Sequence, residues 1–137
     1  MKTALSVTTE IKVPFSDVDM MGVVWHGNYT KYFEVARDIL MNKINMGYIE
    51  MVKSGYLWPI VILNIKYIKP INLEQTILVS ASVQEYENRL KIAYVIKDAQ
   101  TKQKLCKGYS IQVAIEQKTG ELIFQSPNIL LKRIQDF

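Results

Sequence analysis

The chain has very little cysteine and histidine. Among its 137 residues there is one cysteine, Cys106, and one histidine, His26. A lone cysteine cannot form an internal disulfide, which fits a protein of a reducing compartment such as the cytoplasm. These two side chains also cannot form the ligand cluster by which proteins hold zinc or another transition metal. We therefore expect a cytoplasmic protein with no disulfide and no metal.

Long apolar runs and clustered charges are missing as well. No run approaches the roughly 18 apolar residues of a membrane-spanning helix, and the first residues, MKTALSVTTEIKV, lack the pattern of a signal peptide. The net charge is +4, and the lysines are scattered singly along the chain. Such scattering favours a solvated surface, so we expect neither a membrane span nor a nucleic-acid partner. The sequence also has no Gly-rich phosphate loop and no G-x-S-x-G nucleophile motif.

What the chain does have is enough apolar residues, 49%, to form a core. Apolar residues recur at helical spacing from Tyr29 to Ile44, which predicts a helix with a broad buried face. Asn28 is expected to cap its N-terminus, and Gly47 is expected to be the left-handed residue after its C-terminus. A second, shorter helix is expected over the letters YIEMVKSG, which end at Gly55.

Strand-like patterns occupy most of the remaining sequence. Residues 5–15 predict a first strand, and apolar residues later alternate in four segments joined by short polar connections: 61–67, 77–83, 90–96 and 109–115. The segment SPNILLKRIQDF predicts a closing helix, with Ser126 as N-cap and Pro127 at the first helical position. This order predicts one α+β domain over residues 1–137, in which a curved antiparallel sheet cradles the long helix. Long apolar edge strands invite pairing with a second copy, so we expect a dimer.

The segment SDVDMMGVVWHGNYTKYFEVAR, residues 16–37, places two aspartates just before the long helix. Asp17 and Asp19 are either a catalytic carboxylate pair or Asx-turn residues that fix a loop. A carboxylate near a helix N-terminus stays ionised, and the free N–H groups there can stabilise negative charge on a carbonyl oxygen. Asp19 is therefore a candidate base or nucleophile, and Gly22 and Gly27 would let a substrate approach the backbone.

Three other side chains have more than one interpretation. His26 is either a structural histidine or a group that faces substrate at the lip of the helix. Trp25 packs either in the core or against a partner subunit. Cys106 has small neighbours on its strand and no histidine nearby in sequence to activate it, so we expect it in the core.

The same segment carries a family resemblance. DVDMMGVVWHGNYTKYFEVAR resembles the D-x-D-x-x-G-x-V-(aromatic)-(His/Asn/Tyr)-x-x-Y signature of the 4-hydroxybenzoyl-CoA thioesterase-like family, the short-chain bacterial acyl-CoA thioesterases of the hotdog fold. NIKYIKPINLEQTILVSASV resembles that family's strand, basic-Pro turn and next strand, and VAIEQKTGELIFQSP resembles its last hairpin, so nearly the whole chain is covered. The resemblance implies dimers that join two sheets edge to edge, often paired into tetramers. It also implies active sites at the dimer interface and no metal or redox cofactor.

The resemblance further implies roles for single residues. By position, Asp19 matches the catalytic aspartate, and His26 matches the residue whose backbone N–H binds the thioester oxygen, with a histidine side chain assisting in some relatives. The match also implies a substrate-binding set around them: Gly22, Val24, Trp25, Gly27, Asn28 and Tyr29. Two features depart from the family, because the turn after Pro70 reads INLEQ in place of an Asp pair and Lys69 stands where many relatives have Arg. No residue is therefore assigned to the phosphates of coenzyme A.

These residues predict an acyl-CoA thioesterase that releases a free acid and CoA, with Asp19 as nucleophile or general base. Two alternatives stay open: a hotdog-fold hydratase or dehydratase, and a non-catalytic acyl-CoA binding module. Against the first, Asp19 and His26 lie seven positions apart on one loop, unlike the tighter hydratase arrangement. The sequence does not specify the acyl group, which is aromatic, short aliphatic or longer fatty acyl.

Overall fold

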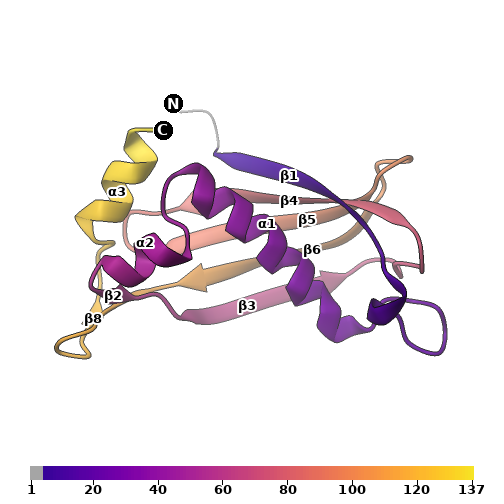
Figure 1. The fold of residues 1–137 in the computed structure, drawn as a ribbon, viewed down its shortest axis with the longest axis horizontal. Helices are drawn as coiled ribbons and strands as arrows, with labels where there is room; N and C mark the ends of the chain where they lie inside the picture. Colours follow the sequence, from indigo (N-terminus) through magenta and orange to yellow (C-terminus); the bar gives the residue numbers. More distant parts are fainter. Residues whose placement is uncertain (1–4) are drawn as a thin grey trace.

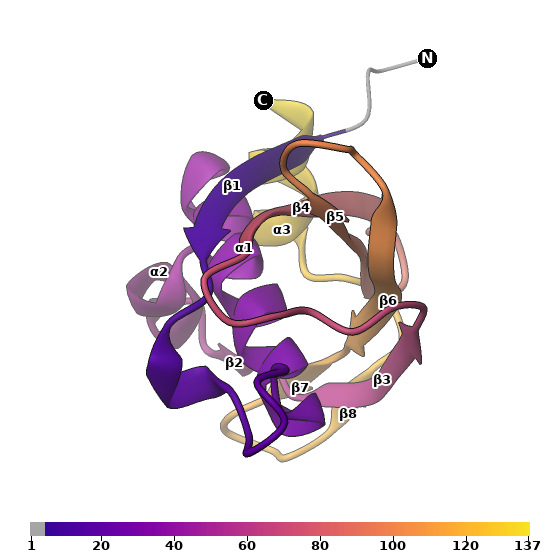
Figure 2. The same ribbon diagram turned by 90° about the vertical axis from the view of Figure 1, so that its right-hand side faces the viewer.

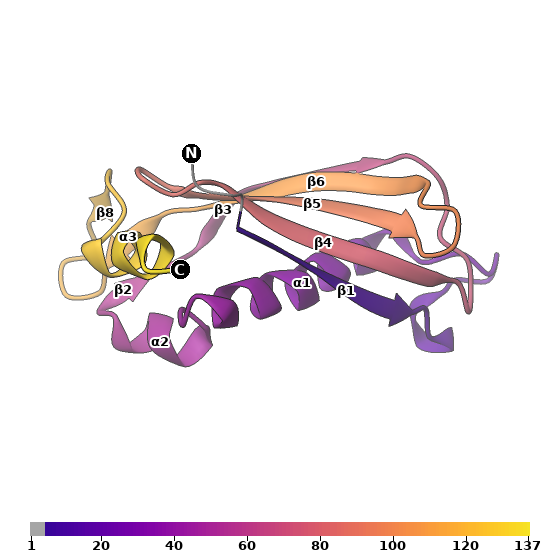
Figure 3. The same ribbon diagram turned by 90° about the horizontal axis from the view of Figure 1, so that it is seen from above.

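The computed structural model describes residues 5–137, so the first four residues of the expected domain lie outside the described residues. Its main unit is a five-stranded antiparallel sheet with the strand order β1-β4-β5-β6-β3 (Figure 1). Viewed from one end, this sheet curves around helix α1, and viewed from above, it lies along one side of the helix (Figures 2 and 3). The helix and strands of this unit are α1 (Tyr29–Lys43), β1 (Ser6–Lys12), β3 (Ile60–Tyr67), β4 (Thr76–Glu85), β5 (Leu90–Asp98) and β6 (Lys104–Gln112).

A smaller sheet and two short helices lie at one end of the molecule (Figure 1). The sheet has the order β2-β7-β8. The predicted strand 109–115 is therefore divided between two sheets, because the chain leaves β3 and β5 after Gln112 and pairs with β8 from Ala114 and with β2 from Ile115. At the break, the N–H of Val113 donates to the carbonyl of Pro59 (3.3 Å). The remaining elements are α2 (Tyr48–Lys53), β2 (Tyr56–Leu57), β7 (Ala114–Glu116), β8 (Leu122–Ile123) and α3 (Asn128–Gln135), with the 3-10 helices η1 (Phe15–Asp17) and η2 (His26–Asn28).

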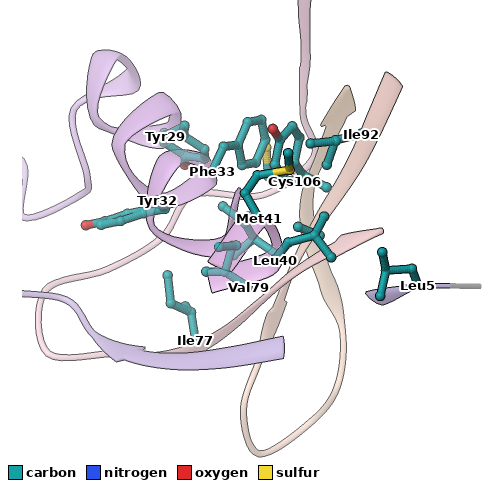
Figure 4. Close-up of a cluster of buried hydrophobic side chains, with 14 of the residues drawn as sticks. Leu5, Tyr29, Tyr32, Phe33, Leu40, Met41, Ile77, Val79, Ile92 and Cys106 are labelled. Carbon is teal, nitrogen blue, oxygen red and sulfur yellow. The ribbon is translucent and has the colours of Figure 1, made fainter. Parts of the chain in front are cut away.

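The core forms where α1 packs on the large sheet. The ring of Phe33 stacks on that of Tyr94 in β5, with centroids 4.4 Å apart and planes 6° apart. Cys106 is fully buried in the same cluster, as expected, and burial raises the pKa of its thiol to about 12. The buried residues of α1 recur at helical spacing, and several are shown in Figure 4: Tyr29, Tyr32, Phe33, Ala36, Leu40 and Met41.

The ends of α1 differ from the predicted caps. Asn28 occupies the N-cap position of α1, as predicted, but its side chain makes no capping bond, because η2 already starts the helical path and gives Asn28 helical angles (φ −82°, ψ −11°). Past the C-terminus of α1, Asn45 takes the left-handed conformation (φ 59°), whereas Gly47 is extended (φ −66°, ψ −178°) and precedes α2. Gly55 after α2 is left-handed (φ 86°), as the sequence predicts.

The closing helix α3 also begins differently from the prediction. It starts at Asn128, with Pro127 as an extended N-cap residue (ψ 148°) in place of a first helical residue. Ser126 provides no side-chain cap, and its backbone N–H donates to the carbonyl of Glu87 (2.8 Å). None of the helices in the described part of the chain combines the length and the apolar character needed to cross a membrane.

One edge of the large sheet is apolar and exposed. β3 is the last strand in the sheet order, and seven of its eight residues are exposed. Val61 and Leu63 on this strand are 54% and 44% exposed, and Val35 and Ile39 on α1 are each 40% exposed. Natural edge strands of this length and composition are usually covered by another chain or element.

Candidate active site

A cavity of about 250 Å³ opens at the N-terminal end of α1. One wall comes from the loop before α1 and from the first turn of the helix, and the other comes from the end of β3 and the segment after it. Tyr29 and Tyr67 join these walls by packing edge to face, with ring centroids 4.7 Å apart. The lining residues are mostly apolar: Val23, Val24, His26, Tyr29, Tyr67, Ile68, Lys69 and Pro70.

Asp17 fastens the loop to the helix. Its backbone carbonyl accepts hydrogen bonds from the backbone N–H of Trp25 (3.0 Å) and from the side-chain amide of Asn28 (2.9 Å). Its buried carboxylate accepts a hydrogen bond from the Tyr32 hydroxyl (2.8 Å) and forms an ion pair with Lys31. Burial alone would raise the pKa of the Asp17 carboxyl, but the hydrogen bonds from Lys31 and Tyr32 outweigh burial and hold the pKa below its usual 3.8. Asp17 is therefore ionised, and its hydrogen bonds hold both ends of the loop in place.

Asp19 forms a turn on the surface. Its N–H donates to the carbonyl of Val23 (2.9 Å), and its carbonyl accepts from the N–H of Gly22 (3.0 Å), which has the left-handed φ of 77°. Its Oδ1 accepts a hydrogen bond from the N–H of Met21 (2.8 Å), so in the single chain Asp19 is an Asx-turn residue. The carboxylate held against the first turns of α1 belongs to Asp17. The catalytic role of the exposed Asp19 stays a prediction.

His26 lines the cavity and is bonded to its far wall through its backbone carbonyl. The exposed imidazole lies beside the Trp25 ring (centroids 4.9 Å apart), and the His26 carbonyl accepts a hydrogen bond from the Tyr67 hydroxyl (3.0 Å). A helix leaves its first N–H groups without an intrahelical acceptor. Because η2 begins at His26, this applies to the N–H groups of His26 and Gly27, and no acceptor within the described residues is bonded to either. Both are available to an oxygen atom of a ligand.

Gly27 has no room for a side chain. A Cβ at this position would lie 2.1 Å from the Trp25 ring. Trp25 itself is 52% exposed, so it packs on its own loop and not in the core. The hydroxyl of Thr30 donates to the Gly27 carbonyl (3.0 Å) and ties this peptide to the first turn of α1.

Residues 21–103 match the thioesterase superfamily. The chain belongs to this superfamily. One relative from Bacillus subtilis (strain 168), named "Putative acyl-CoA thioesterase YneP", is 38% identical over 85 residues, which are 62% of this chain and 61% of the relative. The matched region thus spans about three fifths of the length of that relative.

Solved structures have the same fold. The chain is 31% identical to a DHNA-CoA thioesterase from Staphylococcus aureus, with a TM-score of 0.77 over 87% of this chain and 80% of the other. A 1,4-dihydroxy-2-naphthoyl-CoA thioesterase from Synechocystis is 20% identical, with a TM-score of 0.85 over 96% of this chain and 97% of the other, and this likeness is one of fold. The predicted family and the α+β hotdog fold are therefore confirmed.

Within this thioesterase-superfamily chain, the predicted site residues fall into two groups. Val24, His26 and Tyr29 line the cavity. The others shape the loop and do not line it: Asp19, Gly22, Trp25, Gly27 and Asn28. Among the described residues, no group of three or more His, Cys, Asp or Glu side chains is placed to hold a metal ion.

The far wall of the cavity, residues 67–70, was not predicted as part of the site. It joins the near wall through the hydrogen bond between Tyr67 and His26, which are 41 positions apart. The alternation of apolar residues up to Pro70 predicts a strand, but it does not indicate which loop the end of that strand meets. The pair Lys69-Pro70 was the available signal, because it matches the family's basic-Pro turn, but that match assigned neither residue to the site.

Proposed function

We propose that this chain hydrolyses the thioester of an acyl-CoA to a free acid and CoA. The observation that carries the proposal is the pair of unbonded N–H groups of His26 and Gly27 beside an apolar cavity at a helix N-terminus. Membership of the thioesterase superfamily and the relatives named as CoA thioesterases support the same reaction.

The helix N-terminus acts as the oxyanion site. The thioester oxygen accepts a hydrogen bond from the N–H of His26, at the positive end of the dipole of η2 and α1. Negative charge develops on this oxygen when the carbonyl carbon is attacked, and the N–H group stabilises it. One such donor is typically worth about 3 kcal/mol. The acyl group begins against the packed rings of Tyr29 and Tyr67, and the exposed residue His26 lines the same cavity.

Asp19 supplies the attacking group. Its carboxylate either adds to the carbonyl carbon, forming a mixed anhydride that water then hydrolyses, or removes a proton from a water molecule that adds directly. In both routes the C–S bond breaks, CoA leaves as a thiolate, and the thiolate takes up a proton. The turn around Gly22 and the Met21 N–H hold this carboxylate in one orientation on the loop that leads to His26.

A second copy of the chain completes the site. The exposed edge of β3 offers unpaired backbone groups and apolar side chains, and Val35 and Ile39 extend this surface onto α1. β3 ends at Tyr67 in the wall of the cavity, so a partner paired with β3 lies next to the cavity. We therefore place the active site at the interface of a homodimer, and the single buried Cys106 suits the reducing cytoplasm.

The test is thiol release from a panel of acyl-CoA substrates, followed with a thiol reagent. The wild-type protein releases CoA from at least one of them. Asp19→Asn lowers kcat by about 10²–10⁴-fold, the range expected when a catalytic acid or base is lost. Asp136→Asn, an exposed aspartate at the end of α3, keeps wild-type turnover as the matched control.

Two results would count against the proposal, in different ways. Wild-type turnover by Asp19→Asn would show that Asp19 only shapes its turn, while thioester hydrolysis would stand. A wild-type protein that releases no thiol from any substrate would reject hydrolysis itself, and loss of enoyl absorbance in parallel samples of an enoyl-CoA would indicate a hydratase.

A further inference from the structure

Tyr67 contributes two different groups to the cavity at the start of α1. Its ring lines the cavity and packs edge to face against the ring of Tyr29. Its hydroxyl reaches the opposite wall and donates a hydrogen bond to the backbone carbonyl of His26 (3.0 Å). Partial burial raises the pKa of Tyr67 above its usual 10.0, so the hydroxyl stays protonated and able to donate near neutral pH. A substitution that removes only the hydroxyl therefore separates the two groups.

The carbonyl of His26 accepts two hydrogen bonds, the number that its two lone pairs allow. The first comes from the backbone N–H of Tyr29, which closes the 3-10 turn η2. The second comes from Tyr67, which lies 41 positions away at the end of β3. Helix ends that are held only by local bonds fray. The bond from Tyr67 therefore fastens the start of the helical path to the large sheet.

The N–H of His26, the proposed oxyanion donor, belongs to the peptide that joins Trp25 to His26. The carbonyl of this peptide accepts a hydrogen bond from the N–H of Asn28 (2.9 Å). The C=O and N–H groups of a trans peptide point in opposite directions, so the N–H of His26 points away from the helix. The next peptide plane carries the His26 carbonyl and begins at the same Cα. The direction of the N–H is therefore fixed only while both planes are held, and Tyr67 holds the second one.

We propose that Tyr67 is a positioning residue, whose hydroxyl holds the backbone of His26 so that its N–H meets the carbonyl oxygen of a bound acyl-CoA. The inference rests on the proposed function and adds a residue of the far wall to it. The hydrogen bond to the substrate oxygen strengthens as negative charge develops in the transition state, so a loss of alignment lowers kcat more than it raises KM. Without the hydroxyl, water can bond to the exposed carbonyl of His26 but cannot fasten it to β3.

Tyr67→Phe removes the hydroxyl and keeps the ring that lines the cavity. In the thiol-release assay we expect kcat to fall by about 3–10-fold, the usual effect of one neutral hydrogen bond, and KM to change by less than about twofold. The free energy of unfolding, measured with urea, should be nearly unchanged, because Tyr67 is 48% exposed. A wild-type kcat for Tyr67→Phe would overturn the role of the hydroxyl.

Tyr94→Phe is the matched control. The hydroxyl of Tyr94 is hydrogen-bonded to that of Ser110 (2.7 Å) in the core, and Tyr94 does not line the cavity. Its removal should lower the free energy of unfolding and leave kcat and KM of the folded protein unchanged. A lower kcat without lost stability in one variant, and lost stability without a lower kcat in the other, separate positioning from packing. A fall in kcat of Tyr67→Phe that only matches its loss of folded protein would contradict positioning.

Two non-hydrolysable analogues test the alignment without turnover. In the dethia analogue a CH₂ group replaces the thioester sulfur, and in the thioether analogue a CH₂ group replaces the carbonyl. Acetyl, benzoyl and octanoyl versions of both cover short, aromatic and longer acyl groups. By calorimetry, the wild type should bind at least one dethia analogue about threefold or more tightly than its thioether, and Tyr67→Phe should bring this ratio closer to one. Because the ratio compares two ligands on one protein, partial loss of folded protein does not change it.

The positioning role and the proposed hydrolysis fail in distinguishable ways. A ratio of dissociation constants that is the same in both proteins overturns the role of Tyr67, and thiol release by the wild type then leaves hydrolysis standing. A wild-type protein that releases no thiol rejects hydrolysis. In that case a ratio that falls in Tyr67→Phe supports the positioning of His26 toward a bound carbonyl. A wild-type ratio of one, or no binding of either analogue, overturns the positioning role.

Discussion

At the scale of single residues, two aspartates separated by one position have different physical environments. Asp17 is 3% exposed and has two partners on α1, Tyr32 and Lys31, whereas Asp19 is exposed and bonds only to backbone of its own turn among the described residues. A buried carboxylate stays charged only when such partners offset the loss of water. The anchored residue can therefore fix the loop, while the exposed one remains free to react.

Asp17→Asn keeps the shape of the side chain and removes its charge. We expect the free energy of unfolding at pH 7 to fall by about 1–3 kcal/mol, because the charge-assisted bonds with Lys31 and Tyr32 are weakened. The pKa of Asp17 is lower in the folded protein than its usual 3.8, so its carboxylate stabilises the fold above that pH. This stabilisation is lost as the pH falls through the folded-state pKa. Urea denaturation of both proteins at stepwise lower pH measures the difference.

The difference in the free energy of unfolding between the wild type and Asp17→Asn should therefore have its full size at neutral pH and should become smaller below about pH 4. A difference that kept its size down to the pH of acid unfolding would contradict the conclusion that Asp17 is ionised in the folded protein. Asp136→Asn, which alters an exposed aspartate, is expected to have the same free energy of unfolding as the wild type at every pH.

At the scale of elements, the close approach of α1 to the sheet depends on a glycine in β6. Gly108 lies opposite Tyr94 of β5 and Ile65 of β3 in the antiparallel register. A Cβ at this position would lie 2.2 Å from the carbonyl oxygen of Asn64 and 2.9 Å from the Phe33 ring. The missing side chain therefore leaves space for Phe33 to stack on Tyr94, and this contact sets where α1 sits on the sheet.

Gly108→Ala is expected to lower the free energy of unfolding by about 1–3 kcal/mol, the usual cost of overpacking a dense core. Urea denaturation measures the loss, and near-ultraviolet circular dichroism reports the stacked rings. Adding Phe33→Leu to Gly108→Ala should cost somewhat less than the sum of the two single changes, because the smaller side chain relieves the contact with the ring, although not the contact with the Asn64 carbonyl. Full additivity, or an alanine variant as stable as the wild type, would contradict this role for Gly108.

The helices and strands also show which features of the fold can be predicted from a short stretch of sequence. Helical spacing from Tyr29 onward and alternation in four segments predict the helix and strands, because the buried face of an element is encoded in its own residues. The alternation continues through Val113 although the chain changes sheets there, since a pattern of burial does not name the pairing partner. Asn28 has the chemistry of a cap but follows the 3-10 turn η2, which local propensity did not predict.

The candidate site likewise has one part that the sequence predicted and one part that it did not. Its near wall was predicted because Val24 and Tyr29 belong to one contiguous motif. Its far wall depends on a contact between Tyr67 and His26, 41 positions apart, and only the assembled fold specifies that contact.

At the scale of the whole molecule, part of the exposed apolar surface lies where a second copy would cover it. Leu63 is opposite Ser110 in the register, on the side of the sheet that faces the core, yet it is 44% exposed because no further strand follows β3. Val35 and Ile39 of α1 are also exposed. Pairing of two β3 edges about a two-fold axis would bury these side chains and satisfy the unpaired backbone groups of the edge.

Leu63→Glu tests this assembly, because burying two carboxylates across a two-fold axis is strongly unfavourable. We expect the wild type to sediment as a dimer or larger even-numbered assembly and Leu63→Glu to sediment mainly as a monomer in analytical ultracentrifugation. Thiol release should fall together with the dimer fraction, since we propose that the site lies at the dimer interface. Leu122→Glu is the matched control: Leu122 is 45% exposed on β8, away from the β3 edge, and the variant should keep both the assembly and the activity of the wild type. An active wild-type monomer, or a Leu63→Glu protein that assembles like the wild type, would show that the β3 edge is not the interface.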